Sequence, residues 1–299
     1  MKIAVTTPTG HVGKVVADLL LNAGKDSVKL LCRRPEKLRA SVEQGAQIAV
    51  GSMDDADYLI RATQGCDAML CVTPPAYGSD NLRGFQNRVG KAMAAAVRAN
   101  KIARVVNLSS IGAQWSSGVG PINGLHDVEN WINDAATNVI HLRAGFFFEN
   151  FLAQLEAIRN GGRISWPLPG SCRYPMIATR DIGRVAADLL RDGTWSGGRV
   201  RELHGPTDLS FDGAAEILSE ALGRKIEYVR CEPREMRQMI LDNAVSENIA
   251  NLLLEMYDAI ETGRLRATQR RSPETTTPTT LAEFAQDVIA PLLATPAAH

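Results

Sequence analysis

The residues best suited to chemistry lie in a glycine turn near the N-terminus, Thr7-Pro8-Thr9-Gly10-His11-Val12-Gly13. Glycines let a backbone approach a ligand closely, and the free N–H groups at the start of a helix attract a pyrophosphate. We therefore predict that a dinucleotide cofactor contacts Thr7, Thr9, Gly10, His11, Val12 and Gly13. His11 is equally compatible with a position on the protein surface that contacts no ligand.

The usual turn of this kind has three glycines, and Thr7 occupies the place of the first. A Cβ atom at this position is tolerated if the residue keeps an extended backbone, and otherwise it hinders the close approach of the pyrophosphate.

Arg33 and Arg34 follow the second predicted strand, about 20 residues beyond the glycine turn. Enzymes that prefer NAD commonly place an acidic residue there to bind the ribose hydroxyls. Arginine instead suits a 2′-phosphate through charge-assisted hydrogen bonds. We therefore predict NADP(H) rather than NAD(H), the alternative being a solvated arginine pair.

Polar residues follow the third, fourth and fifth predicted strands, and such strand ends line one edge of a parallel sheet. Ligands of doubly wound folds bind at that edge, so we predict further cofactor contacts from Ser52, Met53, Thr73, Pro74 and Ser109. Phe146, after the sixth strand, is predicted to flank the nicotinamide. With Phe147, Phe148 and Phe151, and with Trp115 and Trp166 elsewhere, it forms either a flat aromatic pocket or core.

Apolar runs alternate with helical patterns through the first half of the chain. The predicted strands cover residues 3–5, 28–32, 46–50, 68–72, 103–108 and 138–142. Strands that are apolar throughout and separated by helices indicate a parallel sheet covered on both faces, in a doubly wound Rossmann fold. We assign residues 1–150 to this NAD(P)-binding domain. Residues 151–299 form a smaller mixed α/β substrate lobe, partly interleaved with it, in which threonine-rich 272–280 is an extended linker to a last helix at 281–293.

Composition narrows the function classes. The chain has 33 basic and 33 acidic residues, which argues against a general nucleic-acid surface. We expect no signal peptide, membrane span or metal site, and the five scattered cysteines are expected to be free thiols of a cytoplasmic protein. A homodimer is left open.

Several stretches match the pattern of a known family: Thr6–Gly13, Cys32–Lys37, Gly51–Asp55, Val106–Ser110, Leu142–Asn150, Asp181–Gly183, Ser210–Asp212, Glu216–Leu218 and Tyr257–Ile260. On these stretches the chain resembles NmrA-like members of the atypical short-chain dehydrogenase/reductases. Within that family it is most similar to bacterial NADPH-dependent quinone and triphenylmethane-dye reductases. The resemblance implies a dinucleotide-binding fold, and the family also includes a regulator without known chemistry.

Typical short-chain dehydrogenases use a Tyr-x-x-x-Lys dyad, in which lysine lowers the pKa of the tyrosine that passes a proton. No tyrosine here has a lysine four residues later, and the expected positions, counted back from Glu129, hold Pro121 and Leu125. His126 is then the best remaining proton donor, although it is equally suited to a solvent-facing position or a bond to Glu129.

These observations predict a reductase that transfers hydride from NADPH to a small planar conjugated acceptor such as a quinone, which needs little acid help. Two alternatives stay open. One is a non-catalytic redox sensor that acts through a protein partner. The other is a reductase of an imine or C=C bond in a specialised pathway.

Overall fold

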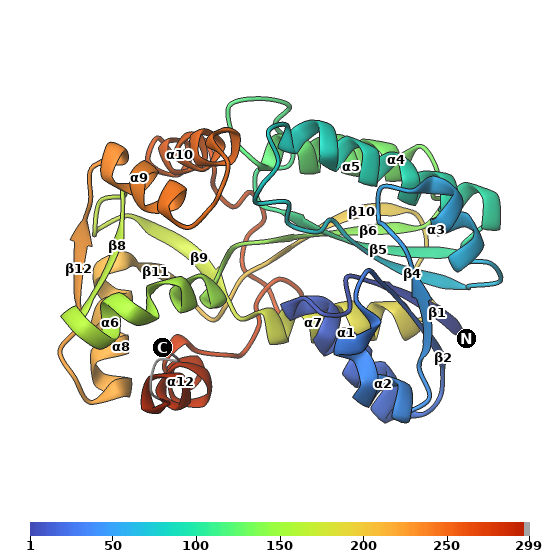
Figure 1. Cartoon of the computed structure of the whole chain (residues 1–299), viewed down its shortest axis with the longest axis horizontal. Helices are drawn as coiled ribbons and strands as arrows, with labels where there is room; N and C mark the ends of the chain where they lie inside the picture. Colours follow the sequence, from blue (N-terminus) through green and yellow to red (C-terminus); the bar gives the residue numbers. More distant parts are fainter. Residues whose placement is uncertain (296–299) are drawn as a thin grey trace.

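A seven-stranded parallel sheet forms the centre of the first lobe in the computed structural model, which describes residues 1–295 (Figure 1). Its spatial order is β10-β6-β5-β4-β1-β2-β3, so the order reverses between β1 and β4. The strands are β1 (Lys2–Thr6), β2 (Ser27–Cys32), β3 (Gln47–Val50), β4 (Ala68–Val72), β5 (Arg104–Ser110), β6 (Val139–Ala144) and β10 (Gly198–Leu203). This order confirms the predicted doubly wound fold.

Helices cover both faces of this sheet, which explains why its strands are apolar throughout. Ile3 and Val5 pack toward one group of helices, whereas Ala4 packs toward the other. One face carries α1 (His11–Ala23), α2 (Arg39–Glu43) and α7 (Thr179–Arg191), and the opposite face carries α3 (Ala56–Ala62), α4 (Leu82–Asn100) and α5 (Ile122–Asn133) (Figure 1).

Helices α1 and α7 approach each other at Gly183. A Cβ atom on Gly183 would lie 2.6 Å from Cβ and Cγ1 of Val15, and 3.3 Å from the carbonyl oxygen of Val12. Real Cβ atoms do not come this close, so the contact requires glycine at this position. The match of Asp181–Gly183 to the family pattern thus has a packing reason.

The second lobe has its own core and two small sheets (Figure 1). Its strands are β7 (Phe146–Phe147), β8 (Arg163–Trp166), β9 (Arg173–Ile177), β11 (Asp208–Ser210) and β12 (Glu227–Arg230). Its helices are α6 (Leu155–Gly161), α8 (Phe211–Leu222), α9 (Pro233–Asp242), α10 (Glu247–Glu261), α11 (Leu281–Phe284) and α12 (Ala290–Ala294), with a 3₁₀ segment at Phe148–Gln154 and a π turn at Ala285–Ile289. Because β10 and α7 complete the first lobe, the chain crosses between the lobes more than once.

The threonine-rich segment is extended, as predicted, but it is packed rather than a free linker. Thr275, Thr277 and Thr279 are buried. Thr277 donates from both its N–H and its hydroxyl to the carbonyl of His204, at 2.8 and 3.0 Å. Thr279 donates from the same two groups to the carboxylate of Asp181, each at 2.9 Å. Thr277 and Thr279 therefore tie the segment to the residue after β10 and to α7.

Two further results concern ligands and membranes. Among residues 1–295, no helix is long and apolar enough to cross a membrane. Within the same range, no group of three or more His, Cys, Asp and Glu side chains is arranged to hold a metal ion.

The α1–α7 contact predicts the effect of a single methyl group. In Gly183→Ala, the new Cβ atom meets the branched Cβ of Val15, so the two helices must separate. We expect the free energy of unfolding to fall by about 1–3 kcal/mol in urea denaturation. Gly78→Ala is the matched control, because a Cβ atom there meets nothing within 4 Å. Equal stability of the two variants would contradict this account.

Candidate functional site

The glycine turn joins β1 to α1 with a tight backbone contact. A Cβ atom on Gly13 would lie 2.2 Å from the carbonyl oxygen of Thr7, so only glycine fits there. That carbonyl accepts a hydrogen bond from the N–H of Gly10 at 3.0 Å. Thr7 does not keep the extended backbone on which tolerance of its Cβ atom would depend. Its φ of 48° is left-handed, because the turn needs that geometry to bring the helix start back over the strand.

The start of α1 suits an anion. Gly10 offers no side-chain cap, and the first turn of the helix has no acidic residue, so its N–H groups are available. Two hydroxyl residues follow neighbouring strands at this edge of the sheet. Thr7 follows β1, and Thr73 follows the adjacent strand β4. Both hydroxyl oxygens are buried without a hydrogen-bond partner in the described residues. Buried polar atoms rarely stay unpaired, so this edge fits a polar ligand such as a dinucleotide.

Arg33 and Arg34 follow the end of β2, as the sequence indicated. Both side chains are exposed, and neither forms an ion pair or hydrogen bond within residues 1–295. They are therefore free to bind a phosphate at the sheet edge. Beyond β3, Met53 is buried, and the exposed Ser52 donates to the carboxylate of Asp54 at 2.5 Å. Thr9, His11 and Val12 lie within the turn or at the start of α1, with Thr9 and His11 exposed and Val12 buried.

A buried polar network occupies the ends of β5 and β6. Arg143 donates two hydrogen bonds to the carboxylate of Glu129, at 2.9 and 2.6 Å, and Ser109 donates a third at 2.5 Å. The exposed fractions of the Arg143 and Glu129 side chains are 12% and 5%. The hydroxyl proton of Ser109 is therefore used within this network.

Gln114 is a member of this network that the sequence did not reveal. It lies in the loop between β5 and α5, and its side-chain oxygen accepts a hydrogen bond from Arg143 at 3.2 Å. A single glutamine in a loop has no sequence signal, and only the fold brings it to Arg143. The loop leads to Pro121, which precedes α5, and to Leu125 in the first turn of α5, the two positions that the count from Glu129 gave for the dyad.

Both ring nitrogens of His126 are engaged. Nδ1 lies 2.8 Å from the carbonyl oxygen of Ala113, which can only accept, so Nδ1 carries the proton. Nε2 lies 3.0 Å from the side-chain nitrogen of Asn130 and accepts from it. The neutral ring therefore has no free N–H for a substrate, which argues against the predicted proton donor.

Phe146 does not face an open pocket. Its ring is buried against Phe151, Trp166 and Phe211, with ring centroids 5.6–6.1 Å apart in edge-to-face contacts. Of the two readings of the aromatic residues, core is the correct one for this cluster. Trp115 differs, because it is 41% exposed beside Gln114, with the guanidinium of Arg264 4.7 Å from its ring centre.

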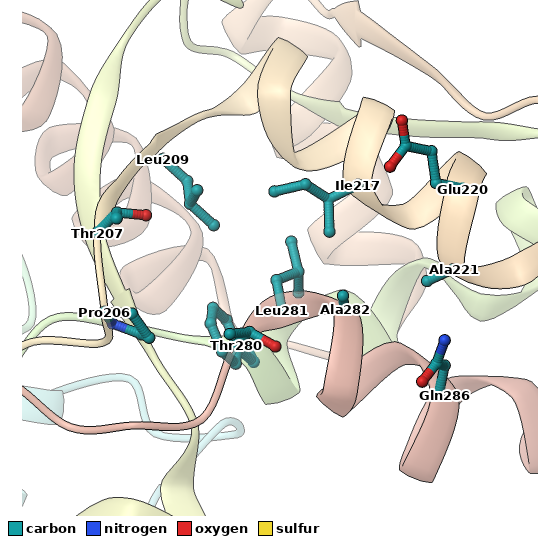
Figure 2. A pocket seen from close by; sticks show the side chains of 11 residues that line it. Pro206, Thr207, Leu209, Ile217, Glu220, Ala221, Thr280, Leu281, Ala282 and Gln286 are labelled. Carbon is teal, nitrogen blue, oxygen red and sulfur yellow. The ribbon is translucent and has the colours of Figure 1, made fainter.

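A cavity of about 400 Å³ lies in the second lobe, where Leu209, Ile217 and Leu281 face one another (Figure 2). Helix α8 and residues 280–286 supply much of its wall. None of its 11 lining residues is among those predicted to bind the cofactor. The cavity is therefore separate from the sheet edge.

The pKa of Glu129 is set by opposing effects. Burial raises it, but hydrogen bonds from Arg143 and Ser109 and the nearby charges of His141 and Arg143 outweigh burial, so the pKa lies below the usual value. For His141, burial lowers the pKa more than Glu129 raises it. Glu129 is thus a stable anion, and it holds Arg143 in place.

Comparison with known sequences supports the pattern found in the residues. The model of the NmrA-like family matches residues 1–285. The chain is 29% identical over 255 residues to an NAD(P)H azoreductase from Xenophilus azovorans, a match that covers 85% of this chain and 86% of that relative.

Two solved structures share the fold. The triphenylmethane reductase of Citrobacter sp., solved with NADP(H), has a TM-score of 0.77 and 23% identity, over 95% of this chain and 99% of that chain. The NADPH-dependent quinone oxidoreductase of Escherichia coli, solved with NADPH, has a TM-score of 0.77 and 21% identity, over 96% and 99%.

The lowered pKa of Glu129 predicts a pH dependence. Between the folded pKa and the unfolded value of about 4.3, the unfolded chain binds more protons, so the contribution of Glu129 to stability is lost as the pH falls. Glu129→Gln should reduce stability at pH 7 and lose less stability than the wild type between pH 5 and pH 3, measured by urea unfolding. Glu43→Gln, at an exposed carboxylate, should keep the wild-type slope. Equal slopes for all three proteins would contradict this assignment.

Proposed function

The chain belongs to the NmrA-like family, and on this premise we propose that it is an NADP(H)-dependent reductase of small planar conjugated acceptors such as quinones. The observation that carries the proposal is the pair of buried hydroxyls on Thr7 and Thr73, unpartnered in the described residues, beside a glycine turn that leads into an uncapped helix. A protein without a ligand at this edge would gain nothing from leaving these groups unpaired.

Each part of the sheet edge has a role in this proposal. Gly10 and Gly13 let the turn approach the pyrophosphate, and the Thr7 hydroxyl hydrogen-bonds to the cofactor. Arg33 and Arg34 bind the 2′-phosphate, and Thr73 contacts the ribose. Bound NADPH supplies the hydride, and the protein supplies orientation and a site for the acceptor.

The type of acceptor follows from the missing dyad. Pro121 and Leu125 cannot pass a proton, so the acceptor must take hydride without a strong acid beside it. Quinones, azo compounds and cationic dyes do this, because conjugation or charge neutralisation stabilises the product. The azoreductase relative and the structural neighbours named for dyes and quinones support this choice.

A non-catalytic redox sensor is the second candidate. It is favoured by the hydrogen bonds of Ser109 and His126, which direct both side chains to structural partners. In such a sensor, cofactor binding would be read by a protein partner, and no acceptor would be reduced.

The Arg33 and Arg34 assignment predicts cofactor selectivity. In Arg33→Ala and Arg34→Ala, the Kd for NADPH should rise roughly 10- to 100-fold, because each removes charge-assisted hydrogen bonds to the 2′-phosphate. The Kd for NADH, which lacks this phosphate, should hardly change. Arg39→Ala removes a nearby exposed arginine and serves as the control. If the wild type binds NADPH and NADH with equal affinity, the assignment of Arg33 and Arg34 to the 2′-phosphate is wrong.

Turnover separates the two candidate functions. With NADPH and a panel of quinones, azo dyes and triphenylmethane dyes, a reductase consumes the reduced nicotinamide absorbance in proportion to acceptor. Tight NADPH binding with no turnover on any acceptor would support the sensor and reject the reductase.

A further inference from the structure

The amide of Gln114 has a fixed orientation. The guanidinium of Arg143 can only donate, so the atom 3.2 Å from it must be the side-chain oxygen of Gln114. The amide nitrogen therefore faces away from Arg143. It makes no hydrogen bond within residues 1–295, and the side chain is half-buried at the carboxyl end of β5. Both of its N–H groups are available to a ligand.

The backbone on both sides of Gln114 is also held. The carbonyl of Ala113 accepts from His126 at 2.8 Å, and the carbonyl of Trp115 accepts from the side chain of Asn123 at 3.2 Å. Both partners lie on α5. A donor fixed in this way before a ligand arrives loses little entropy when it binds.

Other donors at these strand ends are already used. Ser109 donates to Glu129, Ser110 donates to the carbonyl of Ile111 at 3.1 Å, and His126 donates to Ala113. Gln114 thus still has N–H groups to offer beside these strand ends. Its oxygen accepts from the Arg143 guanidinium, which polarises the amide and strengthens those donors.

We infer that the side-chain amide of Gln114 donates a hydrogen bond to the acceptor atom that becomes negative during reduction, an inference that rests on the proposed reductase function. Hydride transfer from NADPH brings two electrons and one hydrogen nucleus to a quinone, leaving the monoanion of the hydroquinone and NADP⁺. Gln114 stabilises the phenolate oxygen but keeps its own protons. A proton from water then completes the hydroquinone.

The first test compares two classes of acceptor. Gln114→Leu removes the donor, whereas Gln114→Glu keeps an oxygen for Arg143 but has no N–H to give. Both variants should lower kcat/KM for quinones roughly 10- to 100-fold. Gln114→Leu, which adds no charge, should leave reduction of a cationic triphenylmethane dye nearly unchanged, because hydride neutralises the dye and no anion forms. Gln286→Leu, in the second-lobe cavity, is the control and should change neither activity.

The second test needs no turnover. Binding of 4-nitrophenolate, an analogue of the phenolate product, is followed by difference absorbance in the presence of NADP⁺. The wild type should bind it at least about tenfold more tightly than either Gln114 variant.

The outcomes distinguish the inference from the function on which it rests. Equal losses with quinone and dye, or equal nitrophenolate binding by all proteins, would overturn the role of Gln114 while leaving the reductase intact. If the wild type reduces no acceptor but binds nitrophenolate through Gln114, the proposed reductase function is wrong. Gln114 is then still a hydrogen-bond donor to a bound anion.

Discussion

The ion pair between Glu129 and Arg143 is the interaction on which the candidate site depends. It ties α5 to β6, takes the hydroxyl of Ser109 on β5, and turns the Gln114 amide. Removing two charges from water costs several kcal/mol per ion, and only good geometry and further hydrogen bonds offset that cost. Both conditions hold here, because Arg143 binds through two nitrogens and Glu129 has a third donor. Apolar residues could fill this space, but they could not orient an amide.

Close backbone approach is the second constraint. Gly13 and Gly183 let α1 lie against both the β1 turn and α7, and neither position has room for a Cβ atom. Thr7 adopts a left-handed backbone at the same turn, at a cost of about 1–2 kcal/mol for a branched residue. The hydroxyl that this residue brings to the sheet edge is the one feature that a glycine would not supply. The backbone strain and the unpaired hydroxyl therefore both result from having threonine at position 7.

Apolar runs and their spacing were sufficient to predict six strands of the sheet, because buried parallel strands and their covering helices leave a local pattern. The seventh, β10, comes from the half of the chain assigned to the second lobe. The span of β4, 68–72, agreed with the sequence. The features that the sequence did not predict depended on distant partners or on backbone angles. Neither the ring direction of Phe146 nor the bonds of His126 can be deduced from neighbours in the chain. Residues 272–280 have the composition of a solvated linker, and only the alternate burial of Thr275, Thr277 and Thr279 distinguishes them from one.

Residues 268–279, which run into the threonine segment, also determine the order in which the molecule can assemble. Glu202 on β10 is fully buried, and Thr268 and Gln269 supply four of its hydrogen bonds, while Asp181 on α7 receives its bonds from Thr279. All of these donors are synthesised after the carboxylates they bind. Until they leave the ribosome, each carboxylate must stay hydrated, because a buried charge without partners is too costly. The edge of the cofactor-side sheet at β10 therefore closes late, after the second lobe has been translated.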